Sequence, residues 1–386
     1  MKNLPRLLYV GDVPVEAGMG GAALLFRLLC EYPRGQAMIL QSRDGEGYER
    51  LPYTSYQVLT KMRLVPSRLP ALRGLVSLMQ TRIQVASLAM TSKAFQPQAV
   101  LSVTHGDTWL AAWDLARRLG LPLHLICHDD WEHFLPVPPF FRGWTRKLFG
   151  AAYRTATSRL CVSPYMEAYY RQQYGAPGTV LYPGRAKDVI ASTTPPSPRS
   201  SGGFTIAYAG SLHSAYAQIL RMLASQLFSI NGCLRIFSRL TSKEARHLGL
   251  DAPNIVIEPV LPPTELIRAL RNGADALVLV MTEPGLGSRI CFPSKLVDYT
   301  ATGLPIIIAA PRESAPAYWA GEHPSAALFV EAGDVNGLRE AVVALANDSA
   351  KRLTLGARAQ EIGNDQFSYT RARDTFFSAV RRRLEN

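Results

Sequence analysis

The pattern of apolar and polar positions predicts a strand–helix–strand unit in the last third of the chain. Residues 276–281 (ALVLVM) are apolar without alternation, which indicates a strand covered on both faces. A glycine-rich loop is expected over residues 283–292, and Ser294 is expected to cap the helix that follows. Gly303 suits a left-handed position at the end of this helix, because Pro305 prevents its continuation. The run PIIIAA then predicts a second buried strand.

The same alternation of buried strand and helix extends along most of the chain. Strands are predicted within residues 7–14, 37–43, 99–107, 123–134, 179–185, 205–209 and 233–240. Residues 187–203 are small, polar and rich in proline, so they predict a linker rather than part of a core. The expected organisation is α/β, with one domain over residues 1–186, a linker over 187–203, a second domain over 204–370 and a basic C-terminal helix over 371–386.

Composition describes a globular protein with an unusual charge. Of the 386 residues, 47% are hydrophobic and 19% are charged, and no run of 18 apolar residues predicts a transmembrane helix. The N-terminus is interpreted as a first strand rather than a signal peptide. Five scattered cysteines predict buried free thiols and a cytoplasmic protein. The net charge of +12 indicates either a polyanionic partner or general solubility.

Two segments concentrate basic and apolar residues. Residues 51–95 carry Lys61, Arg63, Arg68, Arg73, Arg82 and Lys93 against few acids, and residues 136–159 combine four Phe and Trp residues with five basic residues and no acid. Each segment is typical of a surface that binds an anionic membrane or a lipid-linked substrate, although 51–95 also suits a helical hairpin packed beside a sheet. Nucleic-acid binding is not expected, because no zinc finger, RNP-like or helix-turn-helix signature is present.

Candidate chemistry lies at strand ends and on the central helix. Lys295 and Asp298, three positions apart, share one helix face. His105 and His128, the latter followed by Asp129, stand at the carboxyl ends of predicted strands, where α/β proteins bind ligands. A metal held by His128, Asp129, Asp130 and His133 is not expected, because these residues lack a helical HxxxH face. Gly18, Gly20 and Gly21 form GxGG, which does not match the dinucleotide fingerprint.

The central stretch PSKLVDYTATGLPIII resembles the donor-nucleotide motif of family 4 GT-B glycosyltransferases, in which an acidic residue lies five positions before the glycine of a G-x-P turn. Asp298 and Gly303 have this spacing. The turn in YAGSL, the pair His128-Asp129 and the first glycine-rich loop also resemble that family. The resemblance implies two Rossmann-like domains that face a central cleft, with a nucleoside-diphosphate sugar bound by the second domain and an acceptor by the first. It implies neither a cofactor nor a metal.

The resemblance also implies roles for individual residues. Asp298 would hold the ribose, Val260 would lie near the nucleobase, and His128 with Asp129 would act at the transferred sugar. The phosphates would be held by positive charges and backbone amides, at Gly20, Gly21, Gly210, Ser211, Arg239, Arg289, Ser294 and Lys295. The family's first acid, which would stand eight positions before Asp298, is replaced by Ile290, and Glu283 lies further upstream in the same loop.

These observations predict a metal-independent glycosyltransferase that transfers a hexose-type sugar to a glycan or lipid-linked acceptor in cell-envelope or exopolysaccharide synthesis. Retention of configuration is the family expectation, although Ile290 leaves the stereochemistry open. The predicted location is the cytoplasm, with peripheral binding to the inner face of the plasma membrane as an open alternative. A catalytically silent GT-B module that binds nucleotide sugar or glycan is the second hypothesis, favoured by Ile290. A GT-B sugar-nucleotide epimerase would need cleft acids and histidines that the sequence does not identify.

Overall fold

The computed structural model describes residues 4–18, 20–52, 54–59, 64–191, 196 and 203–382. The chain divides into two α/β units. The first comprises residues 1–184, 290–292 and 370–386, and the second comprises residues 185–289 and 293–369. The predicted basic residues Lys61 and Arg63, most of the predicted linker and residues 383–386 lie outside the described part of the chain.

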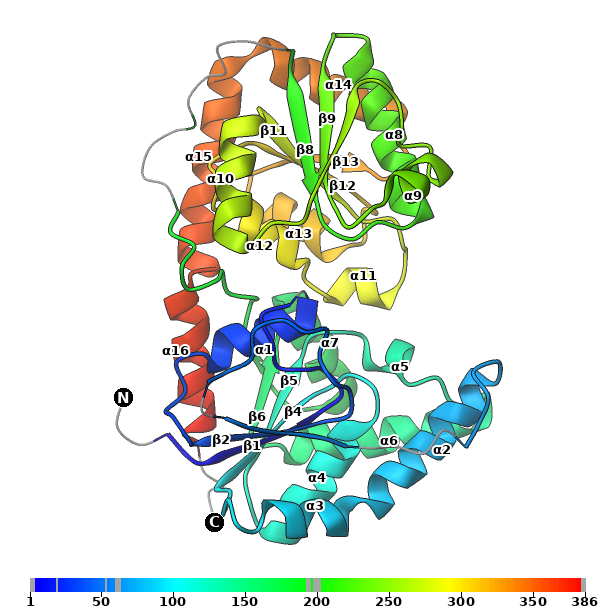
Figure 1. Ribbon diagram of the computed structural model, residues 1–386, viewed down its shortest axis with the longest axis vertical. Coiled ribbons are helices and arrows are strands. Elements are labelled where there is room, and N and C mark those ends of the chain that lie inside the picture. Colours follow the sequence, from blue (N-terminus) through cyan, green and yellow to red (C-terminus); the bar gives the residue numbers. More distant parts are fainter. Residues whose placement is uncertain are drawn as a thin grey trace. The chain divides into compact units, whose positions relative to one another are not determined.

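The first unit is built on a parallel sheet of seven strands in the order β3-β2-β1-β4-β5-β6-β7 (Figure 1). The strands are β1 (Leu7–Gly11), β2 (Ala37–Gln41), β3 (Ser55–Val58), β4 (Ala99–Val103), β5 (Leu123–Cys127), β6 (Ser158–Cys161) and β7 (Thr179–Val180). The helices are α1 (Gly20–Leu29), α2 (Pro70–Ile83), α3 (Val85–Ser92), α4 (Thr108–Leu119), α5 (Trp131–Phe134), α6 (Pro139–Thr155), α7 (Pro164–Tyr174) and α16 (Tyr369–Val380).

The second unit repeats this architecture with six parallel strands in the order β10-β9-β8-β11-β12-β13 (Figure 1). The strands are β8 (Thr205–Ala209), β9 (Cys233–Phe237), β10 (Ile255–Glu258), β11 (Ala276–Val280), β12 (Ile306–Ala310) and β13 (Leu328–Glu331). The helices along this part of the chain are α8 (Ser214–Phe228), α9 (Ser242–His247), α10 (Pro263–Gly273), α11 (Leu286–Ile290), α12 (Ser294–Tyr299), α13 (Ala315–Glu322), α14 (Val335–Asn347) and α15 (Ser349–Gln366).

Both sheets have a position where the strand order reverses. In the first unit this position lies between β1 and β4, and in the second it lies between β8 and β11. The central strands are buried along their whole length because helices cover both faces of each sheet. In an open parallel sheet the loops that leave neighbouring strands on either side of such a reversal diverge and leave a crevice where ligands bind. The loops after β1, β4, β8 and β11 are therefore the first places to look for a site.

Local sequence rules succeed for most elements and fail at a few. Gly303 has φ +73°, the left-handed conformation predicted for the end of the central helix. The capping prediction for Ser294 is wrong: Ser294 is the first residue of α12, Pro293 holds the N-cap position, and no side chain caps the helix. The predicted loop over residues 283–292 contains the short helix α11. Strand β3 was not predicted, because it is a short, largely exposed edge strand without an apolar run.

The thiols are less uniformly buried than predicted. Cys127 and Cys161 are fully buried on neighbouring strands, whereas Cys30, Cys233 and Cys291 are only partly buried. Among the described residues, no helix is both long and apolar enough to cross a membrane.

Candidate active site

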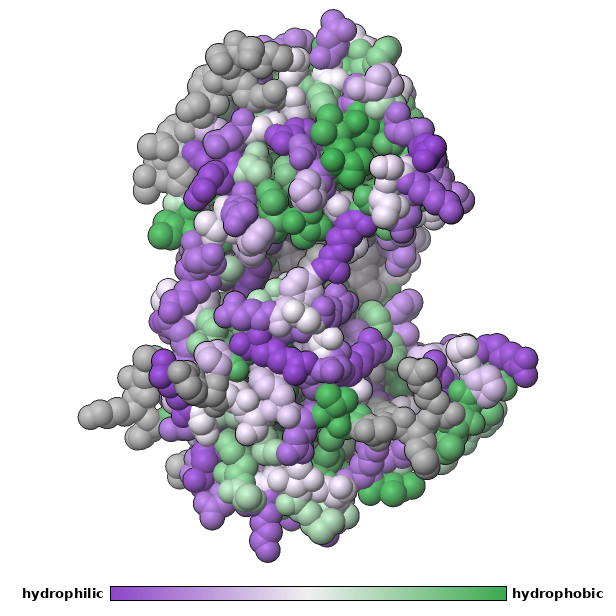
Figure 2. Space-filling model, in the orientation of Figure 1, coloured by the Kyte–Doolittle hydropathy of each residue, from purple (hydrophilic) through white to green (hydrophobic). Residues whose placement is uncertain are grey.

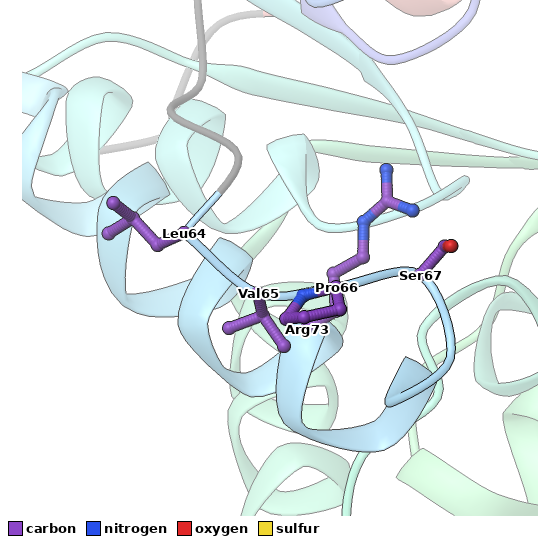
Figure 3. A pocket seen from close by; sticks show the side chains of 5 residues that line it. All are labelled: Leu64, Val65, Pro66, Ser67 and Arg73. Carbon is purple, nitrogen blue, oxygen red and sulfur yellow. The ribbon is translucent and has the colours of Figure 1, made fainter.

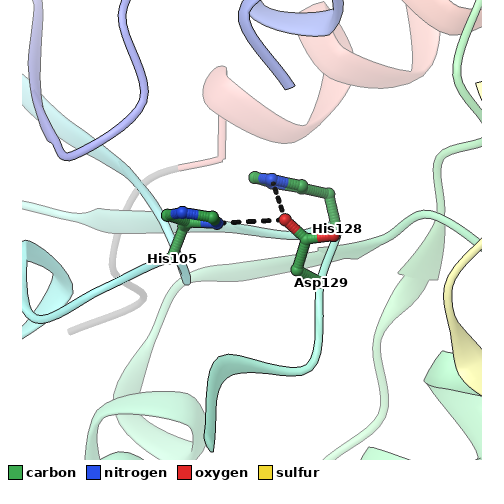
Figure 4. A group of neighbouring side chains, drawn as sticks. All are labelled: His105, His128 and Asp129. Atoms are coloured by element: carbon green, nitrogen blue, oxygen red, sulfur yellow. Dashed lines mark hydrogen bonds and ion pairs between the residues drawn. The ribbon is translucent and has the colours of Figure 1, made fainter. Parts of the chain in front are cut away.

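The ends of β4 and β5 bring three polar side chains of the first unit together. His105 follows β4, and His128 and Asp129 follow β5, which pairs with β4 in parallel register. The Nδ1 atom of His105 lies 3.0 Å from Oδ2 of Asp129, and Nε2 of His128 lies 2.7 Å from the same oxygen. The two imidazole rings are nearly parallel, with centroids 5.6 Å apart. One carboxylate oxygen therefore joins two histidines (Figure 4).

The hydrogen-bond geometry determines where the imidazole protons lie. Burial raises the pKa of Asp129, but the charge and hydrogen bonds of His128 and His105 outweigh burial and hold the pKa below its ordinary value. Because an ionised carboxylate only accepts hydrogen bonds, Nε2 of His128 and Nδ1 of His105 must each donate one. The other ring nitrogen of His128, Nδ1, is buried and has no hydrogen-bond partner among the described residues.

The glycine-rich first loop lies against this cluster. Helix α1 begins at Gly20, which has φ +58°, a conformation that favours glycine. A Cβ atom added at Gly21 would lie only 2.8 Å from Nε2 of His128 and 3.3 Å from Val13. The absence of a side chain at position 21 therefore allows the start of α1 to approach the imidazole of His128.

In the second unit, Lys295 on α12 packs over the turn that follows β8. A Cβ atom added at Gly210 would overlap the Cε atom of Lys295, and Gly210 has φ +142°. The ammonium nitrogen lies 5.3 Å from the ring centre of Tyr208 and 5.7 Å from that of Tyr216. Burial lowers the pKa of Lys295 to about 8. Among the described residues, no carboxylate forms an ion pair with it.

A partly buried ammonium without an acidic partner is costly, because its charge has lost part of its hydration. The two aromatic rings offset only part of this cost. Two further residues belong to the same corner of the second unit. The hydroxyl of Tyr208 donates a hydrogen bond of 2.7 Å to the carbonyl of Ser211 and so braces the turn. The negative charge of Glu283, which follows β11, acts on the nearby Tyr216 and helps burial to raise its pKa. These residues lie at the turns after β8 and β11, the two strands between which the strand order reverses.

Asp298 lies near a buried arginine that the sequence did not single out. Arg185 is 3% exposed, and its guanidinium donates to Oδ1 of Asn364 at 2.6 Å and to Oγ1 of Thr300 at 3.0 Å. Burial lowers the pKa of Arg185 to about 10, and the negative charge of Asp298 acts in the opposite direction. No local pattern marks Arg185, because its partners on α12 and α15 are more than a hundred residues away along the chain.

The comparisons with known proteins agree with this architecture. Residues 39–187 match the sequence model of Glycosyltransferase Family 4. The structure of HepE from Anabaena in complex with UDP is similar, with 16% identity and a TM-score of 0.71 over 97% of this chain and 99% of that chain. Sucrose-phosphate synthase from Thermosynechococcus elongatus is similar as well, with 14% identity and a TM-score of 0.70 over 97% of this chain and 98% of that chain. The chain has the GT-B fold. A search of curated protein sequences found no match.

The GT-B fold confirms the prediction of two Rossmann-like domains. A third similar structure, an alpha,alpha-trehalose-phosphate synthase (UDP-forming) from Burkholderia vietnamiensis, has 13% identity and a TM-score of 0.66 over 98% of this chain and 99% of that chain. At these identities the solved structures establish the fold of the chain and do not assign roles to its residues.

The predicted site residues fall into separate groups. In the first unit, Gly20, Gly21, His128 and Asp129 gather at the ends of β1 and β5. In the second unit, Gly210, Ser211, Glu283 and Lys295 gather at the ends of β8 and β11.

The other predicted residues of the second unit stand apart from that corner. Arg289 forms a 3.8 Å ion pair with Glu313, and both side chains are largely exposed. Arg239 follows β9 and Val260 follows β10, and both are exposed. Ile290, at the position of the family's first acid, is 3% exposed and belongs to the first unit, where its carbonyl accepts a 2.5 Å hydrogen bond from Ser163. An apolar side chain therefore fills that position.

The four-residue metal set considered from the sequence is not assembled. The carboxylate of Asp130 caps α5 and accepts a 3.2 Å hydrogen bond from the backbone nitrogen of Glu132. His133 is exposed on α5, where its ring contacts Phe134. His105 takes their place beside His128 and Asp129. Sequence reasoning noted His105 at a strand end but did not include it in the site, because only the pairing of β4 with β5 makes it a neighbour of Asp129.

Proposed function

We propose that the protein transfers a sugar from a nucleoside-diphosphate sugar to a glycan or lipid-linked acceptor during cell-envelope or exopolysaccharide synthesis. The observation that carries this proposal is the partly buried ammonium of Lys295, placed over Gly210 where the strand order of the second sheet reverses. A diphosphate in contact with Lys295 would supply the opposite charge that the ammonium lacks. The free energy that the protein loses by desolvating this ammonium would then be partly recovered when the donor binds. The published complexes of HepE with UDP-glucose, and with UDP and glucose, support a donor of this class.

In this proposal the second unit binds the donor. Lys295, with backbone amides near Ser211 and Ser294, would stabilise the departing diphosphate without a metal ion. Asp298 would accept hydrogen bonds from the ribose hydroxyls, and His128 of the first unit would contact the transferred sugar. Retention of configuration remains the proposed outcome.

Binding measurements with a set of nucleotides and nucleotide sugars test this proposal. Calorimetry and thermal-shift measurements with UDP, GDP, ADP, dTDP and their common sugars, without added metal, should find one nucleotide that binds and stabilises the protein. Asp298→Asn should abolish this binding while the melting temperature of the free protein stays unchanged. A variant that loses stability and binding together would assign Asp298 a structural role beside Arg185, and binding of no nucleotide would refute the proposed donor class.

Ile290 favours a second candidate function, a GT-B module that binds nucleotide sugar or glycan without transferring it. A carboxylate at this position would carry a negative charge that an apolar side chain cannot replace. The two functions differ in one measurement. Release of nucleoside diphosphate from the bound donor in the presence of acceptor extracts demonstrates transfer, whereas tight donor binding with no release over hours supports the silent module.

We also propose that the first unit binds an anionic membrane surface through α2, α3 and the start of α6. These elements bury one face and expose large apolar side chains on the other, most of all Ile83, Met90 and Phe140, which are 79%, 72% and 80% exposed. No Asp or Glu occurs between Leu51 and Gly106, and none occurs within α6. Arg82 of α2 and Arg146 of α6 pair with Asp114 and Glu132, which lie outside these elements. Apolar side chains beside basic residues are typical of peripheral membrane surfaces. Figure 2 shows such apolar and hydrophilic residues side by side over this part of the molecule.

The two basic segments contact each other where α2 meets the chain that leads into α6. A Cβ atom added at Gly74 on α2 would overlap the carbonyl oxygen of Pro136, three residues before α6 begins. The chain that leads into α2 also borders a hollow of about 500 Å³, lined by residues of one short segment and by Arg73 (Figure 3). These lining residues are Leu64, Val65, Pro66, Ser67 and Arg73.

Liposome co-sedimentation tests the membrane proposal. The protein should co-sediment with vesicles that contain phosphatidylserine, and the bound fraction should fall as the salt concentration rises. It should not co-sediment with vesicles of pure phosphatidylcholine. Ile83→Ser with Phe140→Ser should weaken the binding, whereas Phe228→Ser, which changes an equally apolar side chain that is 63% exposed on α8 of the second unit, should not. Equal binding by both variants would refute this surface.

A further inference from the structure

The cluster formed by His105, His128 and Asp129 has the composition of a transition-metal site. One atom from each residue, an imidazole nitrogen from each histidine and a carboxylate oxygen from Asp129, lies within 4.8 Å of the other two. The atoms come from the ends of two paired strands, so the backbone holds them in place without any long loop. Figure 4 shows both rings directed at the same carboxylate oxygen. We propose that this cluster binds a divalent transition-metal ion such as Zn²⁺.

The donor set selects the class of ion. Two imidazoles and one carboxylate suit Zn²⁺, Co²⁺, Ni²⁺ or Fe²⁺, whereas Mg²⁺ and Ca²⁺ prefer oxygen ligands alone. Three protein ligands leave at least one coordination position for water or a substrate oxygen. The side chains of His105, His128 and Asp129 are 16%, 10% and 29% exposed, so an ion can reach the cluster from solvent.

The distances allow binding with small movements. Bonds of about 2.0 Å to a tetrahedral ion place neighbouring ligand atoms about 3.3 Å apart. The present separations of 2.7 Å and 3.0 Å from Asp129 to the two nitrogens are only slightly shorter. Small side-chain rotations of the two rings away from the carboxylate would therefore open the position for the ion.

Proton positions also permit binding. A nitrogen that binds a metal uses its lone pair, so Nε2 of His128 and Nδ1 of His105 must give up the protons that they donate to Asp129. In the metal-bound protein each ring keeps its one proton on the other nitrogen. For His128 that other nitrogen is Nδ1, which is buried without a partner in the metal-free protein. Because Nδ1 has no partner among the described residues, a proton on this nitrogen breaks no existing hydrogen bond.

Occupancy of this site has a consequence for catalysis that rests on the proposed function. If His128 contacts the transferred sugar, an ion on Nε2 of His128 competes with that contact. Zn²⁺ would then inhibit sugar transfer, and a chelator would restore it. The ion would not serve the donor diphosphate, which the second unit is proposed to hold through Lys295.

Metal titration of the full chain tests the site without any assay of activity. Calorimetry with Zn²⁺ and visible absorption with Co²⁺ should show one ion per chain, with a cobalt spectrum that lacks thiolate charge-transfer bands. The partly buried thiols of Cys30, Cys233 and Cys291 make this last criterion necessary. His105→Gln should weaken affinity by about 100-fold or more, since loss of even an outer-shell partner costs about 10- to 100-fold.

The matched control is His133→Gln, which removes an exposed histidine outside the cluster and should leave affinity unchanged. Asp129→Asn is the second test variant, and circular dichroism with thermal melting checks that each variant folds. Equal affinity of His105→Gln and wild type, thiolate bands in the cobalt spectrum, or no binding by the folded wild type would each overturn the site. Zn²⁺ that binds here but leaves sugar transfer unchanged would instead contradict the proposed role of His128.

Discussion

Replacing Lys295 with methionine should stabilise the free protein and weaken donor binding. Burial lowers the pKa of the Lys295 ammonium from 10.5 to about 8. This difference corresponds to about 3 kcal/mol of destabilisation of the charged folded state. Methionine keeps the stem that packs over Gly210 and can contact the rings of Tyr208 and Tyr216 through its sulfur. After the lost cation–π contacts are subtracted, the expected gain in the free energy of unfolding near pH 7 is about 1–3 kcal/mol.

The sign of the pH dependence follows from the two pKa values. Below about pH 8 the ammonium is charged in both the folded and the unfolded chain, so the burial cost is fully present. Between about pH 8 and 10.5 the folded chain releases the proton while the unfolded chain keeps it, so the wild type gains stability relative to the variant. The advantage of Lys295→Met should therefore be largest near neutral pH and disappear by about pH 10.5.

Urea unfolding of wild type and Lys295→Met at several pH values, together with donor calorimetry, measures both effects. Donor affinity should fall by about 10- to 150-fold, the equivalent of about 1.5–3 kcal/mol for a charged hydrogen bond. Lys243→Met, which replaces an exposed lysine on α9, is the matched control and should change stability by less than about 0.5 kcal/mol. A stability advantage that is absent at neutral pH, or that does not change with pH, would refute the idea of a desolvated ammonium.

Three further predictions concern two glycines and one helix cap. Gly74→Ala should lower the free energy of unfolding by about 1–3 kcal/mol, because its Cβ overlaps the backbone carbonyl of Pro136; urea unfolding would show no change if α2 could move aside freely. Gly210→Ala should displace Lys295 and reduce donor affinity by about 10- to 100-fold in calorimetry, and unchanged affinity would separate Lys295 from the donor site. Thr241→Ala removes the capping box of α9 and should cost about 1 kcal/mol in urea unfolding while donor affinity stays the same; a larger loss of affinity than of stability would link α9 to the donor.

Much of the fold could be predicted because its determinants are local. Apolar runs such as that of β11 favour burial, and a glycine followed closely by proline, such as Gly303, favours the end of a helix. The failures also have local causes. Strand β3 lies at the exposed edge of its sheet and shows no apolar pattern, and Ser294 cannot cap a helix in which Pro293 already holds the N-cap position.

The sequence by itself determined the two α/β units and which polar and charged side chains stand at the ends of their strands. The tertiary structure alone decided which of these side chains meet. His105 becomes a neighbour of Asp129 because β4 pairs with β5, Lys295 lies over Gly210 because α12 packs against the turn after β8, and the two basic segments join where α2 meets residue 136. The physical reason is that strand and helix formation depend on residues a few positions apart, whereas a site depends on contacts between distant segments that only the packed sheet brings together.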